Sequence, residues 1–160
     1  MSERDEFWMR RAVAIAQAGI AQGQTPFGAV IVATAADTLV AEAHNQVWAA
    51  GDPTAHAEIN AIRAAARARA SIALTACTLY STCEPCPMCL AASHWARLER
   101  IVYGAAIADA AAAGFHELAL PAAELLARGG SPVALTAGCL AAECRALFAQ
   151  WPASGRARTY

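Results

Sequence analysis

The 160-residue sequence lacks a long uninterrupted hydrophobic run, although 58% of its residues are hydrophobic. A membrane-spanning helix needs about 20 consecutive apolar residues, so we expect none. Residues 1–17 carry charges on both sides of their apolar residues and contain no small-residue cleavage site, so we also expect no secretory signal. The hydrophobic content, spread without a long polar tract, is typical of one compact domain, which we expect to span 1–160.

An excess of charge of one sign is also missing, because 12 basic and 13 acidic residues give a formal net charge of -1. Dedicated nucleic-acid-binding proteins usually carry a strong positive excess, so we do not expect nucleic acid as the partner, although a local basic patch would fit within this total. We expect the protein to be cytoplasmic, where thiols stay reduced. There, clustered cysteines more often bind metal or do chemistry than form disulfides.

Helical and strand patterns alternate along the chain. Helical composition is found over 2–22, from Thr54 onward, from the cysteines near 86 to about 97, and over 139–151, with a short helix or turn over 107–114. Apolar and β-branched runs predict strands at 27–33, 38–45, 75–82, 100–106 and 132–137. Strands separated by helices of this length favour an α/β fold, with a parallel or mixed sheet between helices on both faces.

Two cysteines with metal-ligand spacing open one of the predicted helices. If that helix starts near Pro85, Cys86 and Cys89 lie on one face of its first turn and can hold one zinc ion. Thirty residues upstream, His56 and Glu58 are two positions apart, and such residues reach one pocket only at the start of a helix. We therefore expect a helix to begin there, with Thr54 as its cap.

Three protein ligands, His56, Cys86 and Cys89, would leave the fourth position of a tetrahedral zinc open, which is typical of a catalytic site. Glu58 would then be a carboxylate beside the metal that accepts and passes on a proton. Three alternatives remain: a closed structural site with Cys83 as fourth ligand, a redox C-x-x-C pair, and a non-catalytic zinc module that holds partners.

The segments HAE at 56–58 and PCPMC at 85–89 resemble the zinc-dependent cytidine deaminase superfamily. The longer segments PFGAVIV, DPTAHAE, LYSTCEPCPMCLAA, HWAR and ADAAAAGF resemble, in order and spacing, the small bacterial guanine deaminases. The resemblance covers nearly the whole chain. It implies the three-layer α/β/α cytidine-deaminase-like fold with a central mixed five-stranded sheet, Zn²⁺ as cofactor, a homodimer, and hydrolysis of guanine, a small-molecule nucleobase, to xanthine and ammonia.

The resemblance also implies further site residues. It gives Asn45 a hydrogen bond to the base, makes Phe27 and Trp95 aromatic walls, makes Asp109 a second acid, and places Tyr160 in a segment that closes the pocket. On physical grounds alone, Asn45 could instead stabilise a turn, the two aromatic residues could be core, and Asp109 could cap a short helix.

Two features keep other substrates open. The chain reads Gly-Phe-His-Glu at 114–117, where guanine deaminases usually carry acidic residues after Gly-Phe, and this bears on how the ring edge is read. Adenosine deaminases acting on transfer RNA share DPTAHAE and EPC-x-MC, but the near-neutral charge, the Ala-Gly-Phe after Asp109 and the lack of a basic tail argue against them. Cytosine or another aminated heterocycle, such as a triazine, is a further alternative.

Overall fold

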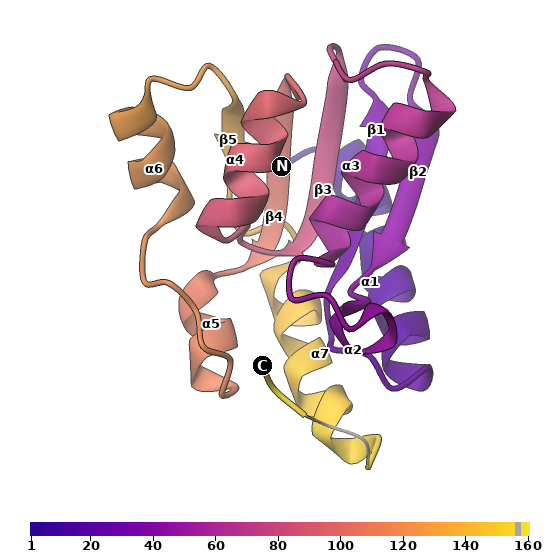
Figure 1. Ribbon diagram of the computed structural model, residues 1–160, viewed down its shortest axis with the longest axis vertical. Coiled ribbons are helices and arrows are strands. Elements are labelled where there is room, and N and C mark those ends of the chain that lie inside the picture. Colours follow the sequence, from indigo (N-terminus) through magenta and orange to yellow (C-terminus); the bar gives the residue numbers. More distant parts are fainter. Residues whose placement is uncertain (156–157) are drawn as a thin grey trace.

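The computed structural model describes residues 1–155 and 158–160, and within them five strands form one mixed sheet (Figure 1). The strands are β1 (Gly28–Ala33), β2 (Thr38–His44), β3 (Cys77–Cys83), β4 (Arg100–Ala105) and β5 (Ala134–Thr136). Their order is β2-β1-β3-β4-β5, with β1 antiparallel to both neighbours and β3, β4 and β5 mutually parallel. The predicted mixed five-stranded sheet is confirmed.

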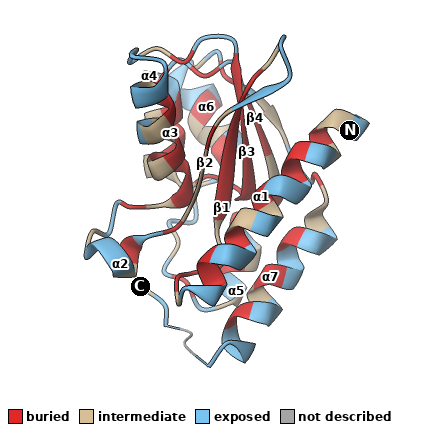
Figure 2. Ribbon diagram, turned by 90° about the vertical axis from the view of Figure 1, so that its right-hand side faces the viewer, coloured by how far each residue is buried: buried red, intermediate tan, exposed pale blue. Residues whose placement is uncertain are grey.

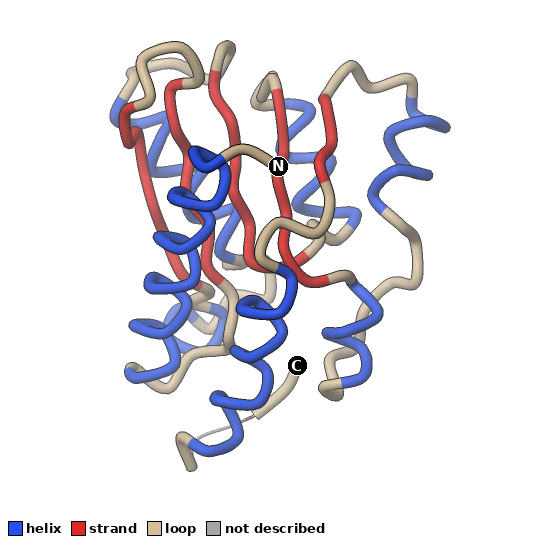
Figure 3. The backbone as a smooth tube through the Cα atoms, turned by 180° about the vertical axis from the view of Figure 1, so that it is seen from behind, coloured by secondary structure: helices blue, strands red, loops and turns tan. Residues whose placement is uncertain are grey.

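Helices cover both faces of this sheet, as the view along its edge shows (Figure 2). One face carries α3 (Ala57–Ala68), α4 (Pro87–Trp95) and α6 (Ala122–Gly129). The other face carries α1 (Glu3–Ala21) and α7 (Ala141–Ala153), which lie in front of the strands when the molecule is seen from behind (Figure 3). The short helices α2 (Val47–Ala50) and α5 (Ile107–Ala112) lie near one end of the sheet.

The core lies on both sides of the central strands. All six residues of β1 are buried, because a strand covered on both faces has no solvent side. Successive side chains alternate between two clusters: Ile31 packs with Leu79 and Leu90 beneath α3 and α4, whereas Val30 packs with Trp8 beneath α1. The buried strands therefore hold both helix layers at fixed positions.

The structure differs from the predicted elements in a few places. It adds α2, which lies between β2 and α3, and α6, which follows Pro121. The last strand is shorter than predicted, and α3 begins at Ala57 instead of near Thr54. None of the helices in the described ranges is both long and apolar enough to cross a membrane.

The sheet topology brings distant segments to one edge. Because β1 runs antiparallel to β2 and β3, its first residues lie beside the last residues of both neighbours: Gly28 pairs with His44, and Ala29 pairs with Ser81. The helices α3 and α4 also begin at this edge, beyond the ends of β2 and β3. Ligand sites of α/β proteins commonly lie at the carboxyl ends of parallel strands, which is the end reached by β3 and β4.

Candidate active site and metal centre

Three potential metal ligands meet where α3 and α4 begin. His56 is the N-cap of α3, Cys86 is the N-cap of α4, and Cys89 lies in the first turn of α4. Their ligand atoms all lie within 4.8 Å of one another, and His56 Nδ1 is 3.7 Å from Cys86 Sγ and 3.5 Å from Cys89 Sγ. Zinc bonds of about 2.3 Å to sulfur and 2.0 Å to nitrogen, at a tetrahedral angle, place such atoms about 3.6 Å apart. The three side chains therefore fit zinc.

Local backbone geometry sets up this arrangement. Both N-cap residues have an extended backbone conformation, and Pro87 suits the first helical position of α4. Thr54 is not the cap that the sequence predicted, because its hydroxyl and backbone N–H both donate to Asp52 Oδ1. The hydrogen bond with Cys89, assisted by His56, lowers the pKa of Cys86 to about 4, so this thiol is ready to bind as a thiolate.

Glu58 is the second residue of α3, and its carboxyl group faces the three metal ligands. Its Oε2 accepts a 3.5 Å hydrogen bond from the Cys89 thiol, and its Oε1 accepts a 3.1 Å bond from the Ser81 hydroxyl. The residue is only 6% exposed, and burial raises the pKa of its carboxyl. A carboxyl group with a raised pKa beside a metal site can both accept and return a proton near neutral pH.

Cys83 does not complete a closed, four-ligand site. Among the described residues, the group with metal-ligand geometry consists of the three side chains above, and the Cys83 thiol instead lies 3.7 Å from the carbonyl oxygen of Ala106. Burial raises its pKa well above the ordinary value, which keeps the thiol protonated. The structure thus supports the open, three-ligand arrangement over the structural alternative.

A pocket surrounds the metal centre, with a cavity volume of about 20 Å³. Its lining combines side chains from both helix N-termini with residues from the ends of the strands and from the loop after α5. These residues are Phe27, Asn45, His56, Glu58, Cys83, Glu84, Cys86, Glu117 and Tyr160. Phe27 contacts Phe115 edge to face at 4.9 Å, so the predicted wall residue joins an aromatic cluster next to the pocket.

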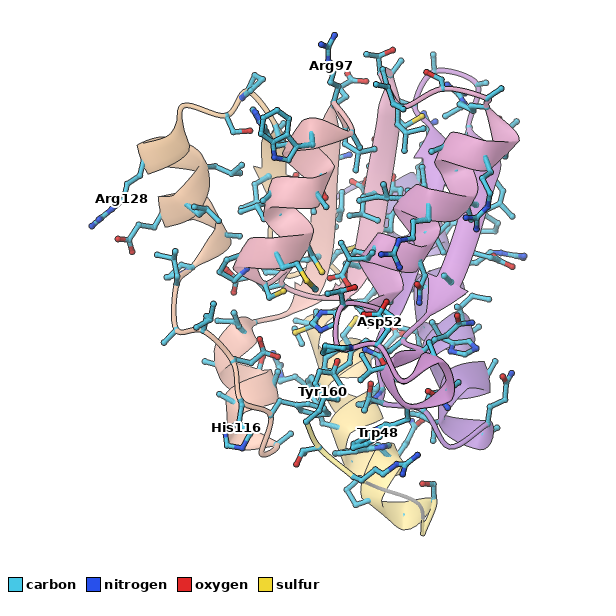
Figure 4. The ribbon with its side chains drawn as sticks, viewed as in Figure 1. Trp48, Asp52, Arg97, His116, Arg128 and Tyr160 are labelled. Atoms are coloured by element: carbon cyan, nitrogen blue, oxygen red, sulfur yellow. The ribbon has the colours of Figure 1, made fainter. Side chains whose placement is uncertain are left out.

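Asn45 and Tyr160 meet in this pocket. Asn45 is fully buried, its Oδ1 accepts from Val47 N–H at 3.0 Å, and its Nδ2 donates to the Tyr160 hydroxyl at 2.6 Å. The Tyr160 ring is 5.6 Å from the His56 ring, and Figure 4 shows Tyr160 between Trp48 and His116. Asn45 therefore combines the predicted turn role, through one side-chain atom, with a position in the pocket, through the other.

The structure places Trp95 away from this pocket, in contrast to the sequence prediction. Trp95 ends α4, nine residues after Cys86, which is a distance of about 13 Å along the helix. It is 79% exposed and lines an outer hollow with Ile72. Arg97, just beyond it, projects from the opposite end of the molecule to Tyr160 (Figure 4). Within its own chain, Trp95 is therefore not a wall of the site.

Besides Glu58, the pocket is lined by Glu84 and Glu117 and not by the predicted Asp109; both carboxylate oxygens of Glu84 accept backbone hydrogen bonds, which leaves Glu117 as the candidate second acid. The carboxylate of Asp109 accepts from the backbone N–H of Ala106 at 2.8 Å and lies 4.0 Å from Arg145, so it caps α5, which was the alternative interpretation. Glu117 lines the pocket, and burial raises the pKa of its carboxyl. The signal that could have found it was Gly-Phe-His-Glu at 114–117, which we interpreted only as a departure from the expected pattern.

Comparison with known proteins agrees with this geometry. Residues 2–105 match the cytidine and deoxycytidylate deaminase zinc-binding region. The guanine deaminase of Bacillus subtilis (strain 168) is 48% identical over 113 residues, which cover 70% of this chain and 71% of the relative. The tRNA-specific adenosine deaminase of Haemophilus influenzae is 42% identical over 117 residues, covering 72% of this chain and 67% of the relative.

A solved structure is similar over most of the fold. The guanine deaminase from Nitrosomonas europaea superposes with a TM-score of 0.86 at 28% identity, and the match covers 92% of this chain and 84% of that one. A match over 92% of the chain extends past residue 105, where the family model ends.

Proposed function

Because this chain belongs to the cytidine and deoxycytidylate deaminase family, we propose that it is a guanine deaminase that hydrolyses free guanine to xanthine and ammonia. The enzyme is a zinc-dependent aminohydrolase. The observation that carries the proposal is the buried Glu58 carboxyl beside a three-ligand centre of His56, Cys86 and Cys89, within a chain 48% identical to a guanine deaminase. The reaction would be a step of purine breakdown.

When bound, zinc supplies a Lewis acid that makes water nucleophilic at neutral pH. The proton movements then fall to Glu58. Its carboxylate takes a proton from the attacking water and gives it to the ring nitrogen next to the reacting carbon. A second proton, taken from the oxygen that is now bonded to this carbon, passes through the same carboxyl to the amine; the carbon–nitrogen bond breaks and ammonia leaves. Ser81 holds Oε1 of Glu58 through its hydroxyl, and Oε2 faces the metal ligand Cys89, whose thiol would give up its proton when it binds zinc as a thiolate.

The rest of the pocket would recognise the base. The Asn45 amide N–H₂ can donate to an acceptor on the ring edge once Tyr160 gives up that bond, and the Glu117 carboxyl can pair with a ring N–H or an amine. Phe27 supplies an aromatic wall next to these polar groups. A flat polar base needs this combination of apolar walls and a few directed hydrogen bonds.

We further infer that the enzyme is cytoplasmic and works as a homodimer. All six cysteines are free, which suits a reducing compartment. The end of α4 exposes Trp95 to 79% beside Ile72 at 90%, around a hollow of about 860 Å³ that a second copy of the chain would cover. Light scattering at micromolar concentration tests this inference, and a monomer there contradicts it.

The test of function is ammonia release by zinc-loaded protein from a panel of free bases, their nucleosides and an RNA stem-loop containing adenosine. We expect turnover of guanine. Activity on the stem-loop alone would instead favour a tRNA adenosine deaminase, as in the Haemophilus relative, and activity on cytosine or a triazine would move the substrate while keeping the mechanism.

Two variants separate the proton carrier from the metal ligands. Glu58→Ala should keep stoichiometric zinc and lose turnover by several orders of magnitude, because the centre remains while its proton carrier is gone. Cys86→Ser should lose zinc and thermal stability together, because one of the three side chains that hold the ion is missing. Retained activity in the first variant, or unchanged zinc content in the second, contradicts the assigned roles.

A further inference from the structure

Glu84 binds the first residues of two helices that begin 23 and 38 residues further along the chain. It lies between the end of β3 and the metal ligand Cys86, and it is 8% exposed. Its Oε2 accepts a 3.0 Å hydrogen bond from the backbone N–H of Ile107, and its Oε1 accepts a 2.8 Å bond from the backbone N–H of Ala122. Both bonds are buried, so one carboxylate binds two peptide groups out of contact with water.

These two peptide groups begin α5 and α6. Ile107 is the first residue of α5, and Ala122 is the first residue of α6. The first N–H groups of a helix have no partner within the helix, and the N-cap positions here, Ala106 and Pro121, supply no side-chain acceptor. An anion at a helix N-terminus is also favoured by the helix dipole, so Glu84 stabilises both helix ends at once.

The segment between the two bonds carries pocket residues. It leaves α5 after Ala112, passes through Phe115 and Glu117, and enters α6 at Ala122. Phe115 contacts the pocket wall Phe27, and Glu117 lines the pocket itself. Glu84 therefore fastens this segment at both ends, on either side of the residues that face the pocket.

The other end of the connection is the metal centre. The backbone N–H of Glu84 donates to the carbonyl oxygen of Ala105 at 2.8 Å, which fixes Glu84 to the end of β4. Two residues later, Cys86 begins α4 as its N-cap. The carboxylate thus fixes the 113–121 segment relative to the stretch of chain that supplies the metal ligands Cys86 and Cys89.

We propose that Glu84 is a positioning residue for substrate. By binding the first peptide groups of α5 and α6, it fixes the positions of Glu117 and Phe115 relative to the metal centre. The proposal rests on the proposed function, because it concerns how that pocket meets its base. It assigns Glu84 no contact with the reacting atoms. Its effect would appear in substrate binding and in the order of the 113–121 segment, with metal binding unchanged.

Glu84→Gln is the sharpest test, because it keeps the size of the side chain and removes one acceptor. The amide has a single oxygen, so one of the two peptide N–H groups would face the N–H₂ group and lose its bond. The matched control is Glu124→Gln, which removes an exposed carboxylate in the first turn of α6 that pairs with Arg128. Glu84→Asp, one methylene shorter, is a second variant that should reach only one of the two helices.

The first readout is hydrogen exchange of the zinc-loaded protein, which does not depend on any substrate. In the wild type, we expect the amides of Ile107 and Ala122 to be protected, although first-turn amides ordinarily exchange quickly. In Glu84→Gln, we expect at least one of them to exchange about tenfold faster or more, as for loss of a hydrogen bond to a charged group. Unprotected amides in the wild type, or unchanged exchange in the variant, overturn the proposal.

The second readout is kinetic, with whichever base of the panel is turned over. We expect Glu84→Gln to raise KM about tenfold with full zinc content, and Glu124→Gln to match the wild type. If Glu84 acts through Glu117, adding Glu84→Gln to Glu117→Gln should raise KM little further. Fully additive effects of the two substitutions on KM contradict this. A wild type silent on guanine but active on another base overturns the guanine assignment alone, since exchange and KM still report on Glu84.

Discussion

Three acidic side chains, Glu58, Glu117 and Asp109, differ in the groups that surround them. Glu58 is held by Ser81 and Cys89 and is almost completely buried, so it suits proton transfer. Glu117 is half-buried at the pocket, and burial raises its pKa. Asp109 already accepts from a helix N-terminus and lies near Arg145, so its carboxylate is committed to α5. Residue type alone does not distinguish these roles, because all three are carboxylic acids at the start of helices or in a nearby loop.

A matched pair of substitutions tests the assignment of the second acid. We expect Glu117→Gln to lower kcat/KM for the base about tenfold or more, since a charged hydrogen-bond partner is lost, while zinc content stays complete. Asp109→Asn should change kcat/KM by about twofold at most, because the amide oxygen of asparagine can still accept the hydrogen bond from the Ala106 N–H and the side chain does not line the pocket. The reverse ranking in steady-state kinetics would return the role to Asp109.

At the scale of elements, two helix N-termini form the centre while a third fixes the other end of the sheet. Asp5, in the first turn of α1, is buried and accepts hydrogen bonds from Arg100 of β4 at 2.8 and 3.1 Å and from the Tyr80 hydroxyl of β3 at 3.1 Å. It also completes a capping box with Ser2. This one carboxylate therefore attaches α1 to two strands of the sheet.

The Asp5 cluster predicts acid sensitivity of the fold. Burial opposes ionisation of Asp5, but the hydrogen bonds from Arg100 and Ser2 outweigh it and lower the pKa from 3.8 to about 2. Because the folded-state pKa is the lower one, the stabilisation is complete above about pH 4 and is lost as the pH falls toward 2. The difference corresponds to about 2 kcal/mol in the free energy of unfolding.

Urea unfolding of the wild type and of Asp5→Asn, at several pH values between 7 and 3, measures this contribution. The variant should be less stable by about 2 kcal/mol at neutral pH, and the difference should begin to shrink below pH 4 and fall to about half by pH 3. A stability difference that stays constant across this range would show that Asp5 contributes by packing and not by its charge.

At the scale of the whole molecule, the last residue of the chain returns to a site built from its middle. Tyr160 packs against the His56 and Phe115 rings and bonds to Asn45, and the cavity left beside it is about 20 Å³. Tyr160 also lines a larger cavity of about 250 Å³ together with His56, Cys86 and Glu117. The centroid of its ring lies 5.6 Å from that of the metal ligand His56.

Removal of zinc should therefore depend on the Tyr160 ring. We expect Tyr160→Ala to release zinc to a chelator severalfold faster than the wild type, because the approach to His56 is uncovered. Tyr160→Phe keeps the ring and should release zinc at nearly the wild-type rate. Equal rates in all three proteins, followed with a zinc-sensitive dye, would mean that the C-terminal segment does not cover the site in solution.

Much of this protein follows from its sequence. The alternation of helical and strand patterns predicted a parallel or mixed sheet with helices on both faces, because periodicity reports which faces are buried, and the family resemblance implied the mixed five-stranded form. Residues His56, Glu58, Cys86 and Cys89 were found because metal chemistry fixes both the residue types and their short spacings within one helix turn. Such local geometry is set within a few residues of the chain.

Tertiary structure alone decided which distant residues share the pocket. Trp95 and Asp109 matched a pattern, yet helix length carries the first about 13 Å from Cys86 and a local cap engages the second. Glu117 and the double contact of Glu84 depend on where α5 and α6 lie relative to β3. Spacing along the chain specifies neighbours one turn apart, whereas contacts between elements depend on how those elements pack, and that is settled only when the whole core forms.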